Sequence, residues 1–164
     1  MRVLGLDPGT ATTGFGVIDY EKEVLQVRKF GLIETSKGNS PGKRLDSIFN
    51  ELTDILKETK PDIVAIEKLF FATNAKTAIR VGQAQGVLLL ASQKQKVEVF
   101  EYAPGTIKKV VTGDGRADKK KVQKAVRSVL GNGVRSKPHK KTHFDNAADA
   151  LAVALCHFKK GVIK

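Results

Sequence analysis

The sequence predicts an α/β fold in which one mixed five-stranded sheet is flanked by helices. Three apolar segments crowd into the first 35 residues with short connections, which is typical of an antiparallel meander. Two further apolar runs, 62–67 and 97–102, alternate with helical patterns, as the strands of parallel β-α-β units do. Three helical stretches follow, so helices are available to cover the faces of the sheet.

The meander is expected to begin with "RVLGLD" at 2–7, a buried strand that ends at a carboxylate and a "PGT" turn. The segments 13–20 and 24–35 read as two further strands. The intervening "EKE" at 21–23 suits a hairpin connection.

The segment 40–62 predicts an amphipathic helix, with Ser40 as N-cap and Pro41 as its first residue. A long helix is expected over 74–95. Gly82 and Gly86 lie four apart in it and permit another backbone to approach closely.

The C-terminal part of the chain should be helical. Shorter helices are expected at roughly 104–112 and 118–130, separated by the loop "TGDGRAD". After a loop rich in lysine and proline, a final apolar helix should begin near residue 145.

Charge and cysteine content indicate the class of partner and the compartment. Lys and Arg total 29 against 17 Asp and Glu, a formal charge of +12, and the excess is concentrated in residues 108–141. A one-sided positive field of this kind favours nucleic acid over a merely solubilising surface. Cys156 is the only cysteine, and no apolar run approaches the ~20 residues that span a bilayer. We therefore expect a cytoplasmic protein with no membrane partner.

Three acidic residues stand where chemistry could gather. Asp7 and Glu67 end predicted strands, and if these strands are parallel neighbours the two carboxylates approach each other. Asp149 lies in the apolar final helix and could complete the group. Repulsion between such carboxylates is relieved by a cation, and oxygen ligands suit Mg²⁺ or Mn²⁺.

Each carboxylate also has a simpler interpretation. Asp7 could be an ordinary turn residue before Pro-Gly, and Glu67 an exposed strand end. Asn146 and Asp149 together resemble a capping box, with the amide as N-cap and the acid three residues later.

Four segments, taken in order, resemble a known family. They are "LGLDPGTATTGFGVID", "DIVAIEKLFFATNAKTAIRVGQAQGVLLL", "VFEYAPGTIKKVVTGDGRADKKKVQ" and "NAADALAVAL". They are similar to RuvC, the bacterial Holliday junction resolvases, over about residues 2–158. The resemblance implies one RNase H-like nuclease domain over 1–164 and a homodimer formed through the helix near residues 75–95. It also implies paired nicks in four-way DNA junctions, with RuvA–RuvB as partner complex.

The resemblance also implies a metal site. Two Mg²⁺ ions, or Mn²⁺ in their place, would promote in-line attack of water on a phosphodiester, leaving 5′-phosphate and 3′-hydroxyl ends. The catalytic and metal-binding positions carried over are Asp7, Glu67, Asn146 and Asp149. Asp7 would bridge the two ions. At the fourth position the family usually has Asp or His, and here it is Asn146. Asp145 and His143 are the alternatives for that ligand.

The resemblance further implies DNA contacts. Phe70 would lie near the junction crossover, although it could equally be a core aromatic beside Phe71. Lys108 and Lys119 match basic residues near the scissile strand. Arg80, Lys120 and Lys121 are candidates for phosphate contacts, with generic positive surface as the alternative.

Two other functions remain open from the sequence. Because an amide is a poorer Mg²⁺ ligand than a carboxylate, Asn146 could leave a junction-binding protein with reduced or lost cleavage. The N-terminal "LGLDPGTATTGFGVID" also resembles the first phosphate loop of actin-like ATPases and sugar kinases. However, the chain is short for two such lobes and has no second glycine-rich loop.

Overall fold

The computed structural model is described for residues 1–69, 74–134 and 141–161; the side chains at 132, 133 and 141–146 lie outside this description. Its five-stranded sheet has the order β3-β2-β1-β4-β5. The strands are β1 (Arg2–Asp7), β2 (Thr12–Glu21), β3 (Val24–Glu34), β4 (Ile63–Glu67) and β5 (Glu98–Tyr102). The first three pair antiparallel, whereas β4 runs parallel to both β1 and β5. The predicted meander and mixed sheet are confirmed.

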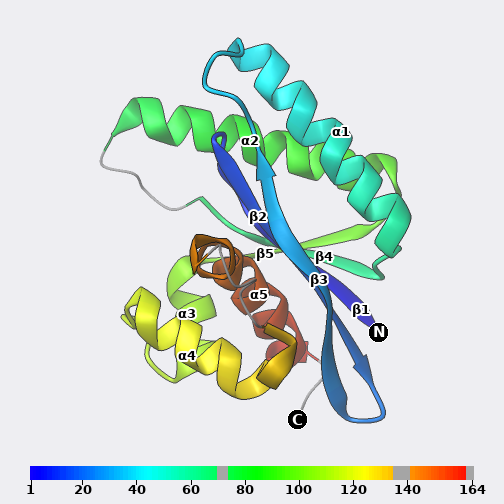
Figure 1. Ribbon diagram of the computed structural model, residues 1–164, viewed down its shortest axis with the longest axis vertical. Coiled ribbons are helices and arrows are strands. Elements are labelled where there is room, and N and C mark those ends of the chain that lie inside the picture. Colours follow the sequence, from blue (N-terminus) through cyan, green and yellow to red (C-terminus); the bar gives the residue numbers. More distant parts are fainter. Residues whose placement is uncertain (70–73, 135–140, 162–164) are drawn as a thin grey trace.

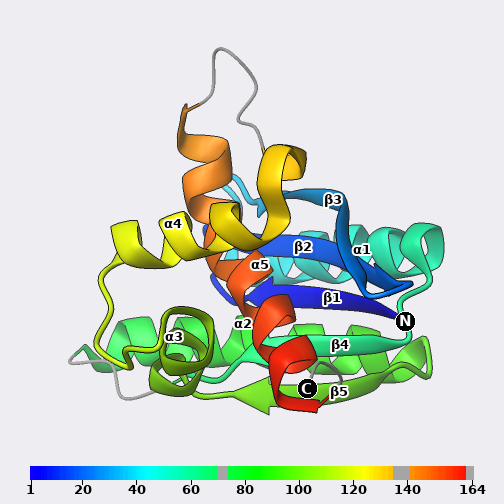
Figure 2. The ribbon, with the colours of Figure 1, turned by 90° about the horizontal axis from the view of Figure 1, so that it is seen from below.

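Helices cover both faces of this sheet. One face carries α1 (Pro41–Thr59) and α2 (Ala75–Lys94). The other carries α3 (Pro104–Thr112), α4 (Lys119–Leu130) and α5 (Lys141–Gly161), with a short 3₁₀ turn, η1 (Gly131–Val134), after α4. Figure 2 shows α5 lying directly against the sheet, with α3 and α4 on its outer side.

Alternating side chains of the central strands form a separate core on each face. Leu4 and Leu6 of β1 are fully buried in the cluster under α1 and α2. Val3 belongs to the cluster around α5. Since successive strand residues point to opposite faces, Asp7 must point toward the α5 face. This alternation decides on which side of the sheet the acidic residues gather.

The close approach of α5 depends on two glycines. Gly5 and Gly16 are cross-strand partners in β1 and β2. A Cβ on Gly5 would lie 2.1 Å from the carbonyl oxygen of Ala150, and one on Gly16 would lie 2.6 Å from Cδ2 of Leu151. Both distances are far inside van der Waals contact. The glycine pair therefore forms a shallow groove in the sheet, and α5 rests in it.

The final helix begins earlier than the sequence indicates. It starts at Lys141 rather than near residue 145, so Asp149 lies about two turns inside it. The capping-box interpretation of Asn146 and Asp149 is therefore wrong, because that motif requires the first turn of a helix. The carboxylate of Asp149 consequently has no free first-turn N–H groups around it, and its partners must come from other elements.

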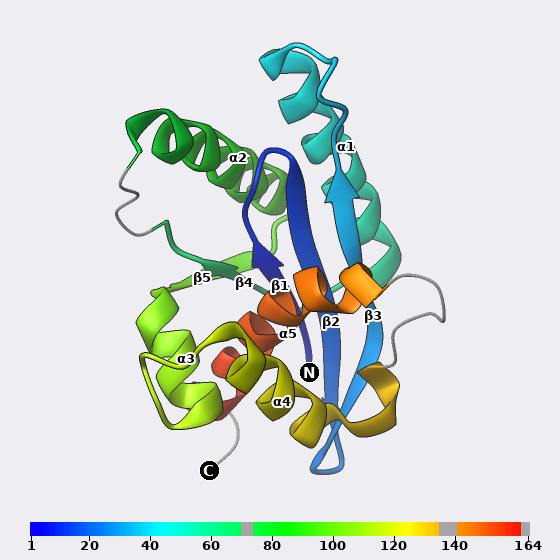
Figure 3. The same cartoon turned by 60° about the vertical axis from the view of Figure 1, so that its left-hand side comes forward.

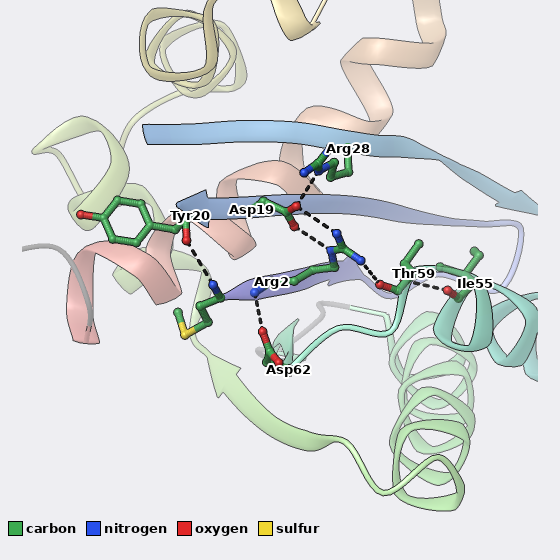
Figure 4. Close-up of polar contacts among 8 residues, drawn as sticks. Arg2, Asp19, Tyr20, Arg28, Ile55, Thr59 and Asp62 are labelled. Atoms are coloured by element: carbon green, nitrogen blue, oxygen red, sulfur yellow. Dashed lines mark hydrogen bonds and ion pairs between the residues drawn. The ribbon is translucent and has the colours of Figure 1, made fainter. Parts of the chain in front are cut away.

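At the end of the sheet where β1 starts, an ion network ties strands to α1. Asp19 is almost fully buried, and its carboxylate accepts from Arg2 Nε at 2.6 Å and Nη2 at 2.9 Å. Arg28 also donates to this carboxylate, and Arg2 reaches the carbonyl of Thr59 at the end of α1 (Figure 4). Arg2, with Arg28, holds the pKa of Asp19 below its ordinary value. The network thus joins β1, β2, β3 and α1.

Candidate active site

Asp7 and Glu67 stand side by side because β1 and β4 are parallel neighbours. Leu6 pairs with Ile66 in the register, so the next residue of each strand emerges at the same edge. Asp149 approaches the same place from α5. All three carboxylates line one cavity of about 240 Å³ on the α5 face. Polar side chains at the carboxyl ends of adjacent strands are a common arrangement in α/β active sites.

Two lysines complete the charged lining of this cavity. Lys108 projects from α3, and Lys119 from the first turn of α4. Lys119 Nζ lies 3.6 Å from Oδ2 of Asp149. The rest of the lining is Pro104, Ile107, Val122 and Ala152. Three acids and two cations therefore share one partly apolar hollow.

The proximity of the acids alters their proton affinity. Burial, together with the charge of Asp149, raises the pKa of Asp7 to about 6, against an opposing effect of Lys119. Burial, then the charges of Asp7 and Asp149, raises the pKa of Glu67 to about 7, partly offset by Lys108. Burial also raises the pKa of Asp149, and the two lysines oppose this. Without a further cation, the three carboxylates are thus unfavourable as a fully ionised set.

The donor set fits hard divalent cations. Three carboxylates provide oxygen ligands of the kind that Mg²⁺ and Mn²⁺ prefer. Nevertheless, among the residues whose side chains are described, no three acidic, His or Cys groups stand ready to hold one ion without rearrangement. The ammonium of Lys119 occupies part of the space beside Asp149. Lys119 and a bound cation would therefore compete for the carboxylate of Asp149.

Other residues singled out from the sequence have different locations. Lys120 and Lys121 are exposed on the first turn of α4, and Lys121 lies 3.6 Å from Asp114. Arg80 lies on α2, so it is on the opposite face of the sheet from this cavity. Phe70 and the side chains of His143, Asp145 and Asn146 lie outside the described residues, so their predicted roles stay predictions.

The first turn of α4 is unusual in its charge. Its first three residues are all lysines, and the first turn carries no acid. Cations are normally disfavoured at a helix N-terminus, where the backbone dipole is positive. Asp118 caps the helix by accepting from the backbone N–H of Lys121 at 2.8 Å. A helix start of this kind, next to an acidic hollow, suits a phosphate-bearing ligand.

Comparison with known proteins agrees with this arrangement. Residues 3–157 match the family model for the crossover junction endodeoxyribonuclease RuvC. The RuvC of Rubrobacter xylanophilus is 48% identical over 155 residues, covering 94% of this chain and 83% of that protein. The RuvC of Caldicellulosiruptor saccharolyticus is 46% identical over 158 residues, with 96% and 92% coverage.

A solved structure shares the fold over nearly its whole length. The Thermus thermophilus RuvC in complex with a Holliday junction substrate has a TM-score of 0.85 and 31% identity. The alignment covers 98% of this chain and 94% of that one. The five-stranded mixed sheet with its flanking helices is thus RNase H-like, as predicted. The chain belongs to the RuvC family of crossover junction endodeoxyribonucleases.

Proposed function

We propose that this chain nicks two like strands of a four-way DNA junction by metal-dependent phosphodiester hydrolysis. The observation that carries the proposal is the single cavity lined by Asp7, Glu67, Asp149, Lys108 and Lys119. Family membership supports the reaction class. It leaves no support for the ATPase alternative suggested by the N-terminal glycine-rich segment.

The metal would be held by the three carboxylates of Asp7, Glu67 and Asp149. Two Mg²⁺ ions, or Mn²⁺ ions, would activate the attacking water and neutralise charge on the leaving 3′ oxygen. Asn146 is the candidate for the fourth ligand position, with Asp145 and His143 as alternatives. Because an amide carries no charge, this chain would have one negative charge fewer than a four-acid site.

The lysines would hold the DNA strand. A phosphodiester is an anion, so three carboxylates alone would repel it. Lys108 and Lys119 project into the same hollow and can bring a phosphate toward the acids. Lys120 and Lys121 extend the positive charge along α4, and phosphate contacts of this type make affinity strongly dependent on salt.

Paired nicking would need two copies of the site, and α2 offers a surface for a second copy. Ile79 is 62% exposed and Leu90 51% exposed on this helix. A Cβ on Gly86 would meet nothing within 4 Å, and one on Gly82 would meet only Leu69, at 3.7 Å. The glycines are therefore not used to pack α2 on its own sheet. We infer a two-fold dimer through α2, which would present two sites to two strands.

Family membership supports a proposal for the partner complex and the cellular location. The proposed partner complex is RuvA–RuvB, and the proposed location is the cytoplasm. Within the described residues, no helix combines the length and apolar character that crossing a membrane requires.

A cleavage assay tests the function directly. The substrates are a labelled four-way junction and a linear duplex of the same sequences, each with Mg²⁺ or with EDTA. We expect nicks only in the junction and only with metal, and we expect Asp7→Asn to abolish them. Asp54→Asn, which removes an exposed carboxylate on α1, is the matched control and should cut normally. Equal cutting by the Asp7 variant would contradict the proposed site.

A further inference from the structure

A second cavity lies on the α1/α2 face, at the end of the sheet where Asp7 stands. Its volume is about 460 Å³. It is walled by the β1–β2 loop, the β3–α1 connection, the start of α1 and the second and third turns of α2. In Figures 1 and 3 these segments stand together at one end of the molecule. We call this hollow the α1/α2 cavity.

Among the described residues, all the charged side chains that line the α1/α2 cavity are positive. Lys37, Arg44 and Arg80 all line it, and its described lining contains no acidic residue. None of the ion pairs found in the described part of the chain involves these three cations. Three cations held around one hollow repel each other, and an anion between them relieves that repulsion.

Arg44 is held in place for such an anion. Its Nε donates to the hydroxyl of Thr35 at 2.8 Å, and that hydroxyl donates to the carbonyl of Thr10 at 2.5 Å. This chain of bonds fixes one edge of the guanidinium. Among the described residues, no hydrogen bond is found for its two terminal nitrogens, which form the fork that matches two phosphate oxygens.

The start of α1 adds to the same field. Pro41, its first residue, is part of the cavity wall. The helix is 19 residues long and has no acid in its first turn. The positive end of its backbone dipole is thus left without an acidic side chain, next to the three cations.

The cavity is close to the proposed active site along the chain. Thr10 and Ala11 form part of its wall, and they follow Asp7 in the loop that joins β1 to β2. Three extended residues span at most roughly 10 Å. Each strand of duplex DNA has one phosphate per roughly 3.4 Å of the axis, so a strand engaged at Asp7 has other phosphates within reach of the α1/α2 cavity.

We propose that the α1/α2 cavity binds a non-scissile backbone phosphate of the junction. Arg44 would donate hydrogen bonds to this phosphate, which would lie between Lys37 and Arg80. This inference rests on the proposed function, since it assumes that a DNA strand occupies the carboxylate site. Through Thr35 and Thr10, the bound phosphate would also steady the loop that follows Asp7.

The test combines protein variants with a neutral phosphate analogue. Single phosphates of the junction are replaced in turn by uncharged methylphosphonate, and binding is measured in Ca²⁺ to prevent cutting. The variants are Lys37→Gln, which removes an exposed cation, and Arg44→Lys, which keeps the charge but removes the fork. The control is Lys57→Gln, an exposed lysine of the last turn of α1.

We expect Lys37→Gln and Arg44→Lys each to weaken junction binding by about fivefold to tenfold. When the logarithm of the affinity is plotted against the logarithm of the salt concentration, Lys37→Gln should make the slope less steep by about 1. The control should bind like the unaltered chain. At one non-scissile phosphate, methylphosphonate should weaken binding of the unaltered chain but not that of Arg44→Lys. Circular dichroism of each variant checks the fold.

The outcomes separate the two proposals. If the unaltered chain fails to bind and cut junctions, the proposed function fails. If it binds and cuts, but both variants match Lys57→Gln at every phosphate, the α1/α2 cavity is not a DNA site. A loss of affinity that disappears when dimer concentration is raised would also overturn the inference, because the cations would then serve subunit contact.

Discussion

Lys119 Nζ lies 3.6 Å from Oδ2 of Asp149, joining the first turn of α4 to the interior of α5. The side chain of Lys119 is 50% exposed and that of Asp149 is 31% exposed, so this is a weak ion pair near the surface that another cation can replace. The same ammonium opposes the rise in the pKa of both Asp7 and Asp149. Lys119 therefore competes with any divalent cation for these carboxylates.

Replacing Lys119 by Met should tighten metal binding in the absence of DNA. The competing charge is worth about 0.2–1 kcal/mol at a site this exposed, so Mn²⁺ affinity should rise about 1.4-fold to fivefold. Titration calorimetry with Mn²⁺ measures this. Cleavage of the junction should fall in the same variant, because the cation that draws in the phosphate is lost. Lys124→Met, an exposed lysine further along α4, is the control and should change neither value.

Metal binding and stability should depend on pH in opposite directions. The pKa of Asp7 is raised to about 6 and that of Glu67 to about 7, so the folded chain retains protons that the unfolded chain has lost. Stability from these groups is complete below the unfolded pKa of each, about 4, and is lost as pH rises through 6 to 7. In EDTA, the melting temperature should thus decline from pH 4.5 to pH 7.5. The double variant Asp7→Asn/Glu67→Gln should show a smaller decline, since Asp149 is then the only one of the three carboxylates with a raised pKa. The Mn²⁺ affinity of the unaltered chain should rise over the same interval.

Placing a methyl group at Gly5 should displace α5. The added Cβ would meet the carbonyl of Ala150 at 2.1 Å and the backbone nitrogen of Ala154 at 2.7 Å. Overpacking against backbone atoms typically lowers the free energy of unfolding by about 1–3 kcal/mol. Urea unfolding of Gly5→Ala measures this loss. Gly42→Ala, in the first turn of α1, meets open space and should not be destabilised. If Gly5→Ala has unchanged stability, α5 does not rest in the glycine groove.

Asp19→Asn should destabilise the chain at neutral pH. The carboxylate is buried and holds Arg2 and Arg28, so an amide leaves two cations without their counter-charge. We expect a loss of about 1–3 kcal/mol in the free energy of unfolding. The pKa of Asp19 is lowered, so its contribution is present above pH 4 and is lost as pH falls further. The difference in the free energy of unfolding between Asp19→Asn and the unaltered chain should consequently become smaller in acid. If it stays the same, the loss comes from altered packing and not from the missing charge.

Asn146→Asp should raise junction cleavage in Mg²⁺ or Mn²⁺ without much change in junction affinity. Residues three apart share a helix face, so position 146 belongs with Asp149 on α5. A carboxylate at this position would add a charged ligand. Equal cleavage by both forms would point to Asp145 instead, and Asp145→Asn would then reduce the rate.

The sequence predicted the mixed sheet, but parallel pairing of the strands that end at Asp7 and Glu67 entered only as a condition, which the structure meets. The sequence misplaced the start of α5, because "KTHF" looks like a continuation of the lysine-rich loop and Asn146 has the chemistry of a cap. Local cap signals are weak compared with the tertiary contacts of a buried helix.

The α1/α2 cavity could not be predicted from the sequence. Lys37 and Arg44 are close in sequence, but Arg80 is distant from both, and the charges of this half of the chain nearly cancel, so the sequence does not show that the three share one hollow. The Gly5–Gly16 groove was also missed. From the sequence alone, a glycine in a strand indicates only a less stable strand. Its role becomes clear when the helix that packs against it is known. Both features depend on contacts between distant segments.

The glycine groove has a consequence for how the chain matures. Asp149 reaches the two strand-end carboxylates only after α5 has settled against Gly5 and Gly16, and α5 is synthesised after every strand of the sheet. A growing chain can pair its strands while the acidic hollow still lacks one wall. A chain whose α5 has not docked therefore lacks Asp149 at the cavity, and its set of carboxylates is incomplete.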